Sequence, residues 1–267
     1  MSDKIFYKYK KIYEHTYDLL LKNEFYYSFP HEMNDPFDCY IYSEYKGEKK
    51  DYINFLKWYP GSEEEKVRAY KFFESCNFDP EEIYRKIILP VRNNESKIAL
   101  INCFSAVNDS IIMWSHYAEF HKGICLGFNA VYEGNLLYFE VEDIVTKSEQ
   151  DLNKYAPLYK VNYSDSFPEP FNGLKDDDKE IFKFLITKFG DWNYEKEYRS
   201  ILWYDNVNKK IIKFRKDILK EVIFGMRTPE AEKNKITDLV NEIYIKKGFD
   251  VKLKTARQAQ KDYKILI

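Results

Sequence analysis

The side chains with the clearest chemical potential stand in one run, Trp192-Asn193-Tyr194-Glu195-Lys196-Glu197-Tyr198-Arg199. We expect a strand here, and alternate residues of a strand share one face, so Glu195, Glu197 and Arg199 should point the same way. Glu197 would then act as a base or hold a ribose hydroxyl, while Arg199 would hold a phosphate or a carboxylate. The alternative is a structural ion pair of Glu197 with Arg199, or a pairing with an aspartate of residues 35–38. The residue types leave both interpretations open.

A polar turn, Met33-Asn34-Asp35-Pro36-Phe37-Asp38, carries the second set of candidate side chains. The residue before a proline avoids the α region, so Asp35 is extended or part of a turn. Asn34, Asp35 and Asp38 would bind a metal, orient a substrate or cap the segment that follows. Short polar side chains around a proline are also ordinary turn chemistry, and that alternative stays open.

The third set lies on a helix that we expect between a capping Ser110 and a terminating Gly123. Trp114, Tyr117 and His121 lie at i, i+3 and i+7 and share a face of that helix. Trp114 and Tyr117 are more typical of a core than of a base-stacking platform, although both remain candidates for substrate binding.

Two histidines belong to the same segment. His116 and His121 are separated by about 140° around a helix, so they do not form a His-x-x-x-His metal pair. His121, at the expected helix end, is the candidate for a catalytic role, and His116 for substrate binding. The helix dipole would also favour a protonated His121 for purely structural reasons.

The four cysteines give no sign of a metal site. Cys39, Cys76, Cys103 and Cys125 contain no Cys-x-x-Cys pair and have no histidine at zinc-finger spacing. We therefore expect neither zinc nor a structural disulfide. A Cys/His nucleophile pair stays open, although Cys103 and Cys125 stand in apolar strands where a thiol is usually inert. The sequence also lacks a Gly-rich phosphate loop, a Gly-x-Ser-x-Gly elbow and a His-Glu-x-x-His motif.

The composition restricts the classes of partner. The 267 residues include 42 basic and 44 acidic side chains, and the net charge of −2 argues against a large nucleic-acid-binding face, although a local basic groove is compatible with it. The aromatic share of 18% fits either an aromatic core or a stacking pocket, and compositional drift favours the core. We find no signal peptide and no apolar run near the ~20 residues that span a bilayer, so we expect a cytoplasmic protein without a membrane partner.

The elements that must position these residues alternate irregularly. Strands are expected at 5–9, 24–29, 97–104, 124–128, 136–141, 158–163, 198–204, 210–214 and 222–224, with tails at 251–253 and 263–267. Helices are expected at 12–22, from Asp176-Asp177-Asp178 to Gly190, and from a capping Thr228 with Pro229 in first position to Gly248. Residues 48–96 are helical and form an insertion or cap, cut at Pro60-Gly61 and Asp79-Pro80. The pattern predicts one α+β domain over 1–267, with a mixed or antiparallel sheet flanked by helices.

Four clusters, together with the opening Tyr7-Lys8-Tyr9, resemble domain-of-unknown-function family 2971. They are Met33–Asp38, Met113–Ala118, His121–Phe128 and Trp192–Arg199. The resemblance covers nearly the whole chain apart from residues 48–96. It implies a bacterial or phage-borne cytoplasmic domain, sometimes linked to phage defence, and the family name carries no activity.

The chain also resembles ADP-ribosyltransferases more distantly. That resemblance implies an early strand whose His or Arg holds the nicotinamide dinucleotide, and a later strand whose carboxylate often stands in Glu-x-Glu. Lys8-Tyr9 occupies the place where relatives have His-Tyr, and Glu195-Lys196-Glu197 would supply the acid. NAD would be the ligand, and Lys8 would contribute to binding it.

Three hypotheses follow. The first is an effector or toxin that binds a nucleotide and catalyses ADP-ribosyl transfer or NAD cleavage. The second is a nuclease that holds Mg²⁺ with Asp35, Asp38 and Glu197. The third is a non-catalytic sensor or interaction module in which these residues form an ion network. In each case we expect the 31–38 turn, the Trp114–His121 helix and the Glu195–Arg199 segment to meet in space.

Overall fold

The computed structural model describes residues 4–92, 98–143, 154–204 and 209–267, and the chain forms two compact units. The first consists of Met1–Phe29, Ala99–Tyr163 and Gly190–Ile267, and the second of Pro30–Ile98 and Ser164–Phe189. The chain therefore leaves the first unit twice and returns to it twice. Each unit has buried apolar clusters of its own.

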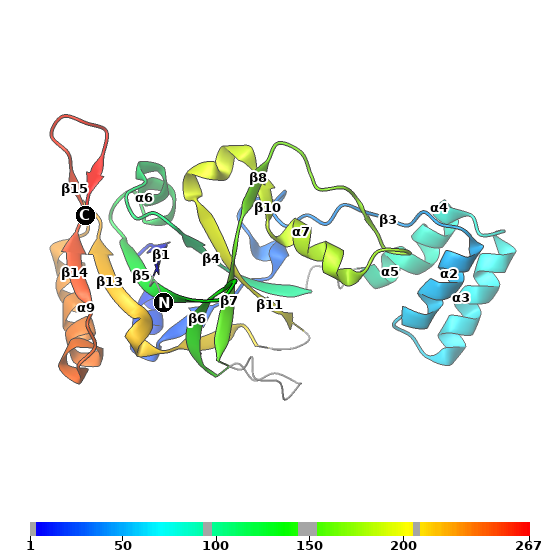
Figure 1. The fold of residues 1–267 in the computed structure, drawn as a ribbon, viewed down its shortest axis with the longest axis horizontal. Coiled ribbons are helices and arrows are strands. Elements are labelled where there is room, and N and C mark those ends of the chain that lie inside the picture. Colours follow the sequence, from blue (N-terminus) through cyan, green and yellow to red (C-terminus); the bar gives the residue numbers. More distant parts are fainter. Residues whose placement is uncertain (1–3, 93–97, 144–153, 205–208) are drawn as a thin grey trace. The chain divides into compact units, whose positions relative to one another are not determined.

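Ten strands of the first unit form one sheet in the order β14-β13-β5-β1-β4-β11-β7-β6-β12-β2 (Figure 1). Neighbouring strands are antiparallel, except that β13 and β14 are parallel. The end of β5 also pairs with β6, which closes β5, β1, β4, β11, β7 and β6 into a ring. The expected α+β class with a mixed sheet and flanking helices is confirmed. The strands are β1 (Lys4–Lys10), β2 (Glu24–Tyr26), β4 (Ala99–Ser105), β5 (Ile124–Glu133), β6 (Leu136–Asp143), β7 (Tyr155–Lys160), β11 (Glu197–Trp203), β12 (Ile211–Phe214), β13 (Leu219–Phe224) and β14 (Lys252–Thr255).

Phenylalanines fill the inner face of this ring. Phe6, Phe104, Phe128 and Phe139 are buried there, and the ring centroids of Phe104 and Phe139 are 4.7 Å apart. Phe25 of β2 packs against the same group, 4.9 Å from Phe128. Each such ring buries a large apolar area, so much of the unusual aromatic content serves the core.

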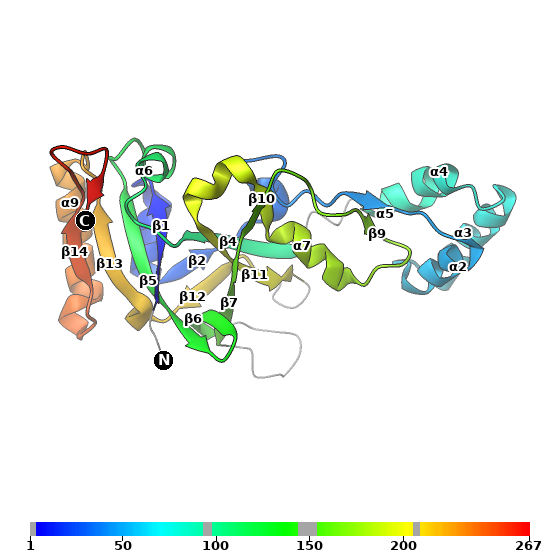
Figure 2. The same ribbon diagram turned by 45° about the horizontal axis from the view of Figure 1, so that its top comes forward.

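The described residues of the first unit form the following α-helices (Figure 2). They are α1 (Glu14–Lys22), α6 (Ile111–Tyr117) and α9 (Glu230–Ile243). The expected end of α1 is confirmed, because Asn23 adopts the left-handed conformation with φ of 50°. The expected N-cap of α6 is also confirmed, because the Ser110 side chain accepts a hydrogen bond from the Met113 amide.

Two expected helix ends in this unit are wrong. The Ser110 helix ends at Tyr117 and not at Gly123, because Glu119, Phe120 and His121 all have positive φ. At α9, Thr228 does not cap the helix, since its hydroxyl donates to the Gly123 carbonyl instead. Pro229 is the N-cap residue, and Gly248, with φ of 89°, follows a 3-10 turn (Ile245–Lys247) that comes after the α-helix.

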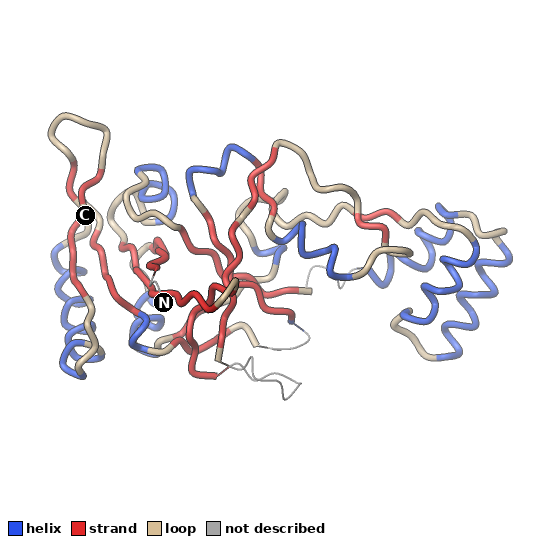
Figure 3. The backbone as a smooth tube through the Cα atoms, viewed as in Figure 1, coloured by secondary structure: helices blue, strands red, loops and turns tan. Residues whose placement is uncertain are grey.

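The insertion expected at 48–96 is helical as far as the structure describes it, to residue 92, and lies in the second unit (Figure 3). Its helices are α2 (Lys49–Trp58), α3 (Glu63–Ser75), α4 (Pro80–Ile83) and α5 (Leu89–Arg92), with a π-helical turn (Tyr84–Ile88) before α5. Although each piece is short, they share one apolar cluster around Tyr52, Phe73 and Ile83. The second unit therefore has a small helical core of its own.

The rest of the second unit is made of short elements. These are a 3-10 turn (Pro30–Glu32), β3 (Ser43–Glu44) paired in parallel with β9 (Phe171–Asn172), a 3-10 turn (Asp178–Ile181), α7 (Phe182–Leu185) and β10 (Thr187–Phe189). The helix expected from Asp176 to Gly190 is thus wrong in length, because the chain becomes extended at Thr187. The short strand β8 (Asn162–Ser164) runs across the boundary of the units. Near the C-terminus, β15 (Arg257–Gln258) and β16 (Ile265–Leu266) form a hairpin.

The first prediction tests the single domain that the sequence pattern indicates. Phe73→Ala removes a fully buried ring from the helical core and should lower the free energy of unfolding by about 3–5 kcal/mol. Val67→Ala on the exposed face of α3 should change it by less than about 0.5 kcal/mol. If the chain is one cooperative domain, urea unfolding followed by circular dichroism shows one transition that shifts as a whole. A split into two transitions, with only one of them moved, would contradict the single domain.

Candidate functional site

Glu197 is the first residue of β11, and the register of the sheet determines its neighbours. Glu197 lies opposite Ser105 of β4, and Ser105 also lies opposite Tyr7 of β1. Residues directly opposite each other in an antiparallel pair share a face and lie about 5 Å apart. Tyr7, Ser105 and Glu197 therefore form one row across three adjacent strands, on the face opposite the phenylalanine core. We call it the outer row.

The outer row continues toward β13 because of a glycine. Gly127 of β5 lies opposite both Tyr7 and Glu221. A Cβ at Gly127 would lie 3.1 Å from Tyr7 Cε1, so the glycine leaves room for the tyrosine ring to cross β5. The Tyr7 hydroxyl lies 3.5 Å from Glu221 Oε2. Burial, followed by the charge of Glu221, raises the pKa of Tyr7 to about 12, so the phenol keeps its proton at pH 7.

Glu197 and Arg199 form a buried bidentate ion pair. Arg199 Nε donates to Glu197 Oε1 at 2.8 Å, and Nη2 donates to Oε2 at 3.2 Å. The two residues are 3% and 0% exposed, respectively. A fork of two parallel bonds fixes the plane of the carboxylate, so the pair holds Glu197 in one orientation. The Glu197 amide also donates to the Tyr163 hydroxyl at 2.8 Å.

Glu195 is not part of the strand, and its expected alternation with Glu197 is wrong. A 3-10 segment (Gly190–Glu195) precedes β11, and Lys196 has φ of 46°, which interrupts the extended backbone. Glu195 is nevertheless buried. Its Oε1 accepts from the Tyr117 hydroxyl at 2.5 Å, and its carbonyl accepts from Ser105 Oγ at 2.6 Å. These bonds connect the start of β11 to α6 and β4.

The aromatic residues of α6 divide into core and surface. Trp114 is fully buried, stands edge-on to Tyr9 at 5.3 Å, and donates from Nε1 to the Asn108 carbonyl. His116 is exposed, and its Nδ1 lies 3.3 Å from the Tyr194 hydroxyl. The exposed side of α6 and the 3-10 segment thus present His116 and Tyr194 next to each other.

His121 follows α6 in a left-handed turn and is not on the helix. Its ring is stacked on Trp114, with centroids 6.2 Å apart and planes at 10°, and Nε2 lies 3.4 Å from Ser115 Oγ. Burial, followed by the charge of Arg227, lowers the pKa of His121. The protonated helix-end histidine considered from the sequence is therefore not favoured here.

Lys8 points to the face of β1 opposite Tyr7, into the core. Its ammonium donates to Asn102 Oδ1 and, at 3.0 Å, to the Cys103 carbonyl. It also lies 5.0 Å above the ring of Phe104. Desolvation lowers the pKa of Lys8 to about 7. The residue of β1 that lies in the outer row with Glu197 is Tyr7. The sequence analysis did not select it, because the resemblance pointed to Lys8-Tyr9.

The turn of Asn34, Asp35 and Asp38 belongs to the second unit. Asp35 Oδ1 accepts from the Phe37 amide at 2.9 Å, which is the turn chemistry expected of an aspartate before a proline. Asp38 is buried and lies 3.5 Å from the Lys188 ammonium, which is buried too. The predicted meeting of this turn with α6 and β11 involves both units and stays a prediction.

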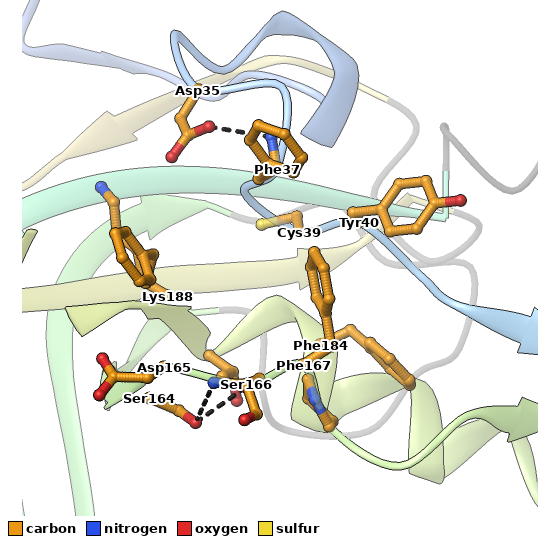
Figure 4. A pocket seen from close by; sticks show the side chains of 13 residues that line it. Asp35, Phe37, Cys39, Tyr40, Ser164, Asp165, Ser166, Phe167, Phe184 and Lys188 are labelled. Carbon is orange, nitrogen blue, oxygen red and sulfur yellow. Dashed lines mark hydrogen bonds between the residues drawn. The ribbon is translucent and has the colours of Figure 1, made fainter. Parts of the chain in front are cut away.

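A pocket of about 280 Å³ in the second unit is a site that the sequence did not predict. Its walls are formed by residues 35, 37, 39, 40, 164–168, 184 and 187–189 (Figure 4). Aromatic residues make up a large share of the pocket lining, and Phe37, Tyr40 and Phe167 are among them. Aromatic residues beside prolines, as in Pro36-Phe37 and Phe167-Pro168, are the sequence feature from which this pocket could have been predicted.

The described residues contain no group of three His, Cys, Asp or Glu side chains that could hold a metal ion together. All four cysteines are free thiols. Burial raises the pKa of both Cys103 and Cys125 well above the usual value, and Glu197 adds to the effect at Cys103. Among the described residues, no helix has the length and apolar character needed to cross a bilayer.

The second prediction concerns Lys8, whose ammonium points into the core. From pH 7 to its ordinary pKa of 10.5, the unfolded chain binds a proton at Lys8 that the folded chain has lost, so this lysine makes stability rise with pH. Lys8→Met removes the effect. Between pH 7 and 9, the free energy of unfolding of the wild type minus that of the variant should increase by about 1 kcal/mol per pH unit. The exposed Lys11→Met is the control and should run parallel to the wild type. If the free energies of unfolding of the wild type and of Lys8→Met change in parallel with pH, the Lys8 amine of the wild type is solvated and the prediction is wrong.

Comparison with known families confirms part of the resemblance. Residues 113–200 match the model of a family described as "Protein of unknown function (DUF2971)". The match runs from α6 to β11 and includes three of the four clusters seen in the sequence, whereas Met33–Asp38 lies outside it. Neither the curated proteins nor the solved structures gave a match. Over this stretch the chain is similar to the 2971 family.

Proposed function

We propose that this chain binds NAD at the outer row and cleaves its nicotinamide–ribose bond, as an ADP-ribosyltransferase-like enzyme. The observation that carries the proposal is the register that puts Tyr7, Ser105 and Glu197 in one row. The distant resemblance implies an early strand and a later Glu-x-Glu strand that act on one dinucleotide. In the fold, β1 and β11 are the two neighbours of β4, which supports that arrangement.

Hydrolysis of NAD would proceed without a change of oxidation state. The bond between ribose C1′ and the nicotinamide nitrogen breaks, and its electron pair leaves with nicotinamide. A water oxygen forms the new bond at C1′ and releases one proton. In the transferase version, a nucleophilic side chain of a target protein replaces the water.

Glu197 would supply the negative charge for this reaction. A carboxylate next to the ribose can accept a hydrogen bond from a ribose hydroxyl and stabilise the positive charge that develops at C1′. Arg199 would act as a positioning residue, because its two bonds hold the carboxylate plane. The neutral Tyr7 hydroxyl, whose one proton faces Glu221 at 3.5 Å, would have to turn away from that carboxylate to donate a hydrogen bond to the ligand. His116 and Tyr194, at the exposed side of α6, offer rings for the planar base.

The resemblance to the 2971 family would make such an enzyme a cytoplasmic effector of phage defence, acting as a toxin through loss of NAD. This biological role rests on the family resemblance alone, whereas the chemistry rests on the outer row.

One observation favours a second candidate, the non-catalytic module. Glu197 and Arg199 are both buried and bonded in a fork, which is the geometry of a structural ion pair. In that case the same residues would hold β11 in register, and the chain would act by binding a partner. Removing either charge would then affect stability and leave no activity to lose.

The third prediction separates these candidates with Glu197→Gln. The change removes the charge and retains the size, so NAD hydrolysis, measured as nicotinamide release well below the melting temperature, should fall by about 10²–10⁴-fold. Loss of the negative charge from the buried fork with Arg199 should also lower the free energy of unfolding by about 3–5 kcal/mol. Activity is therefore normalised to the folded fraction, measured by circular dichroism at the assay temperature.

Glu140→Gln is the matched control, since Glu140 forms an ion pair with Arg215 at 3.3 Å on the same sheet but outside the outer row. Its NAD hydrolysis should equal that of the wild type. If Glu197→Gln is destabilised but keeps its activity per folded molecule, or if the wild type releases no nicotinamide with any target, Glu197 is a scaffold residue and the module is favoured.

A further inference from the structure

The pocket of the second unit is walled by aromatic rings that its core does not use. Phe37 is 67% exposed, Tyr40 51%, Phe167 50% and Phe189 48%, although each could have been buried. Tyr40 and Phe167 are already paired, with ring centroids 5.8 Å apart. Exposed rings gathered around one cavity leave apolar area in contact with water. A ligand that covers these rings removes that area from water, which is favourable.

Two carboxylates among the polar groups of the pocket accept hydrogen bonds and repel anions. Asp35 and Asp165 stand on opposite sides of the cavity (Figure 4). An ionised carboxylate is an acceptor without a donor, so these groups select N–H edges. Asp35 uses Oδ1 for the Phe37 amide, which leaves Oδ2 for other donors.

The lysine of the pocket does not offset these charges. Lys188 is 5% exposed, and its ammonium lies 3.5 Å from the buried Asp38 carboxylate. An ammonium already neutralised by a buried partner gives little attraction to a phosphate. The charged lining residues that reach solvent are therefore the carboxylates Asp35 and Asp165.

We propose that this pocket binds the base of a purine nucleoside, with guanine preferred. The rings of Phe37, Tyr40 and Phe167 would stack on the flat base, and a carboxylate would accept its N–H groups. Guanine presents an amino group beside a ring N–H, whereas uracil presents mainly carbonyl acceptors, which the carboxylates repel. A volume of about 280 Å³ is near the lower limit of ligand pockets, which fits a base or nucleoside rather than a dinucleotide.

Isothermal titration of the full chain with guanosine, adenosine, cytidine, uridine and guanosine monophosphate tests the proposal. Guanosine should bind most tightly, with uridine at least about tenfold weaker because its single N–H lies between two carbonyl acceptors. Guanosine monophosphate should bind more weakly than guanosine, and added salt should reduce the difference, because the carboxylates repel the phosphate.

Three variants identify the groups responsible. Phe167→Ala should weaken guanosine binding about tenfold, the scale of one lost stacking contact. Asp165→Asn should reduce the preference for guanosine over uridine. Phe120→Ala is the control, because Phe120 is 65% exposed in the first unit and does not line the pocket. Its affinity for guanosine should match that of the wild type.

Several outcomes would overturn the proposal. They are an absence of guanosine binding at millimolar concentration, equal affinity for all four nucleosides, or a Phe167→Ala variant that binds like the wild type. The result is independent of NAD cleavage, because Glu197→Gln should bind guanosine unchanged. Guanosine binding without nicotinamide release would support this pocket and contradict the proposed enzyme. Nicotinamide release without guanosine binding would contradict this pocket and support the enzyme.

Discussion

Closure of the sheet through β5 is the constraint on which the first unit depends. This strand of ten residues pairs with β1 over Ile124–Ala130, with β13 over Ile124–Phe128 and with β6 over Val131–Glu133. A closed ring of six strands has a fixed interior, and alternate residues of every strand must fill it. The phenylalanines occupy those positions, so the other face of β1, β4 and β11 is where polar side chains can gather. The outer row is a consequence of ring closure.

The interior also holds polar side chains, and Lys8 and Asn102 are two of them. Lys8 and Asn102 share the face of Phe6 and Phe104, and Asn102 Nδ2 has no hydrogen-bond partner among the described residues. A buried amide without a partner costs about 1–3 kcal/mol. The lysine reduces part of its own cost by losing its proton readily, since desolvation lowers its pKa to about 7. This pair is therefore a weak point of the ring, located beside the strand that joins Tyr7 to Glu197.

Local patterns predicted the elements of this fold better than they predicted the relations between elements. The strand β1 was visible in the sequence from its β-forming residues, and the stripe of Ile236 and Val240 in α9 was visible because one buried face imposes a period. The end of α6 was not, because the left-handed run at Glu119–His121 depends on a contact made elsewhere. The His121 carbonyl accepts from the Arg227 amide, and a Cβ at Gly225 would lie 2.1 Å from that oxygen. Such a close approach comes from the tertiary fold and leaves no local signal.

The candidate site shows the same division. The importance of Glu197 and Arg199 could be argued from their types and spacing, but their fork and the row with Ser105 and Tyr7 require the strand register, which a sequence does not fix. Glu195 entered the site for a different reason from the expected one. It does not alternate with Glu197 but is held by Tyr117 of α6 and by Ser105 of β4. The pocket of the second unit was missed because loop aromatics have no period.

The family match can be interpreted through these bonds. It begins in α6 and ends in β11, and these two ends meet in the first unit. Tyr117 donates to Glu195, and His116 lies next to Tyr194, across 78 residues of chain in each case. A stretch whose ends are bonded in this way needs β4 beside it, because Ser105 holds the Glu195 carbonyl. β4 lies outside the matched residues, so the matched stretch does not contain the whole site. The outer row therefore depends on β1 and β4, which precede the matched residues, and on β11 within the match, so its chemistry must be tested in the full chain.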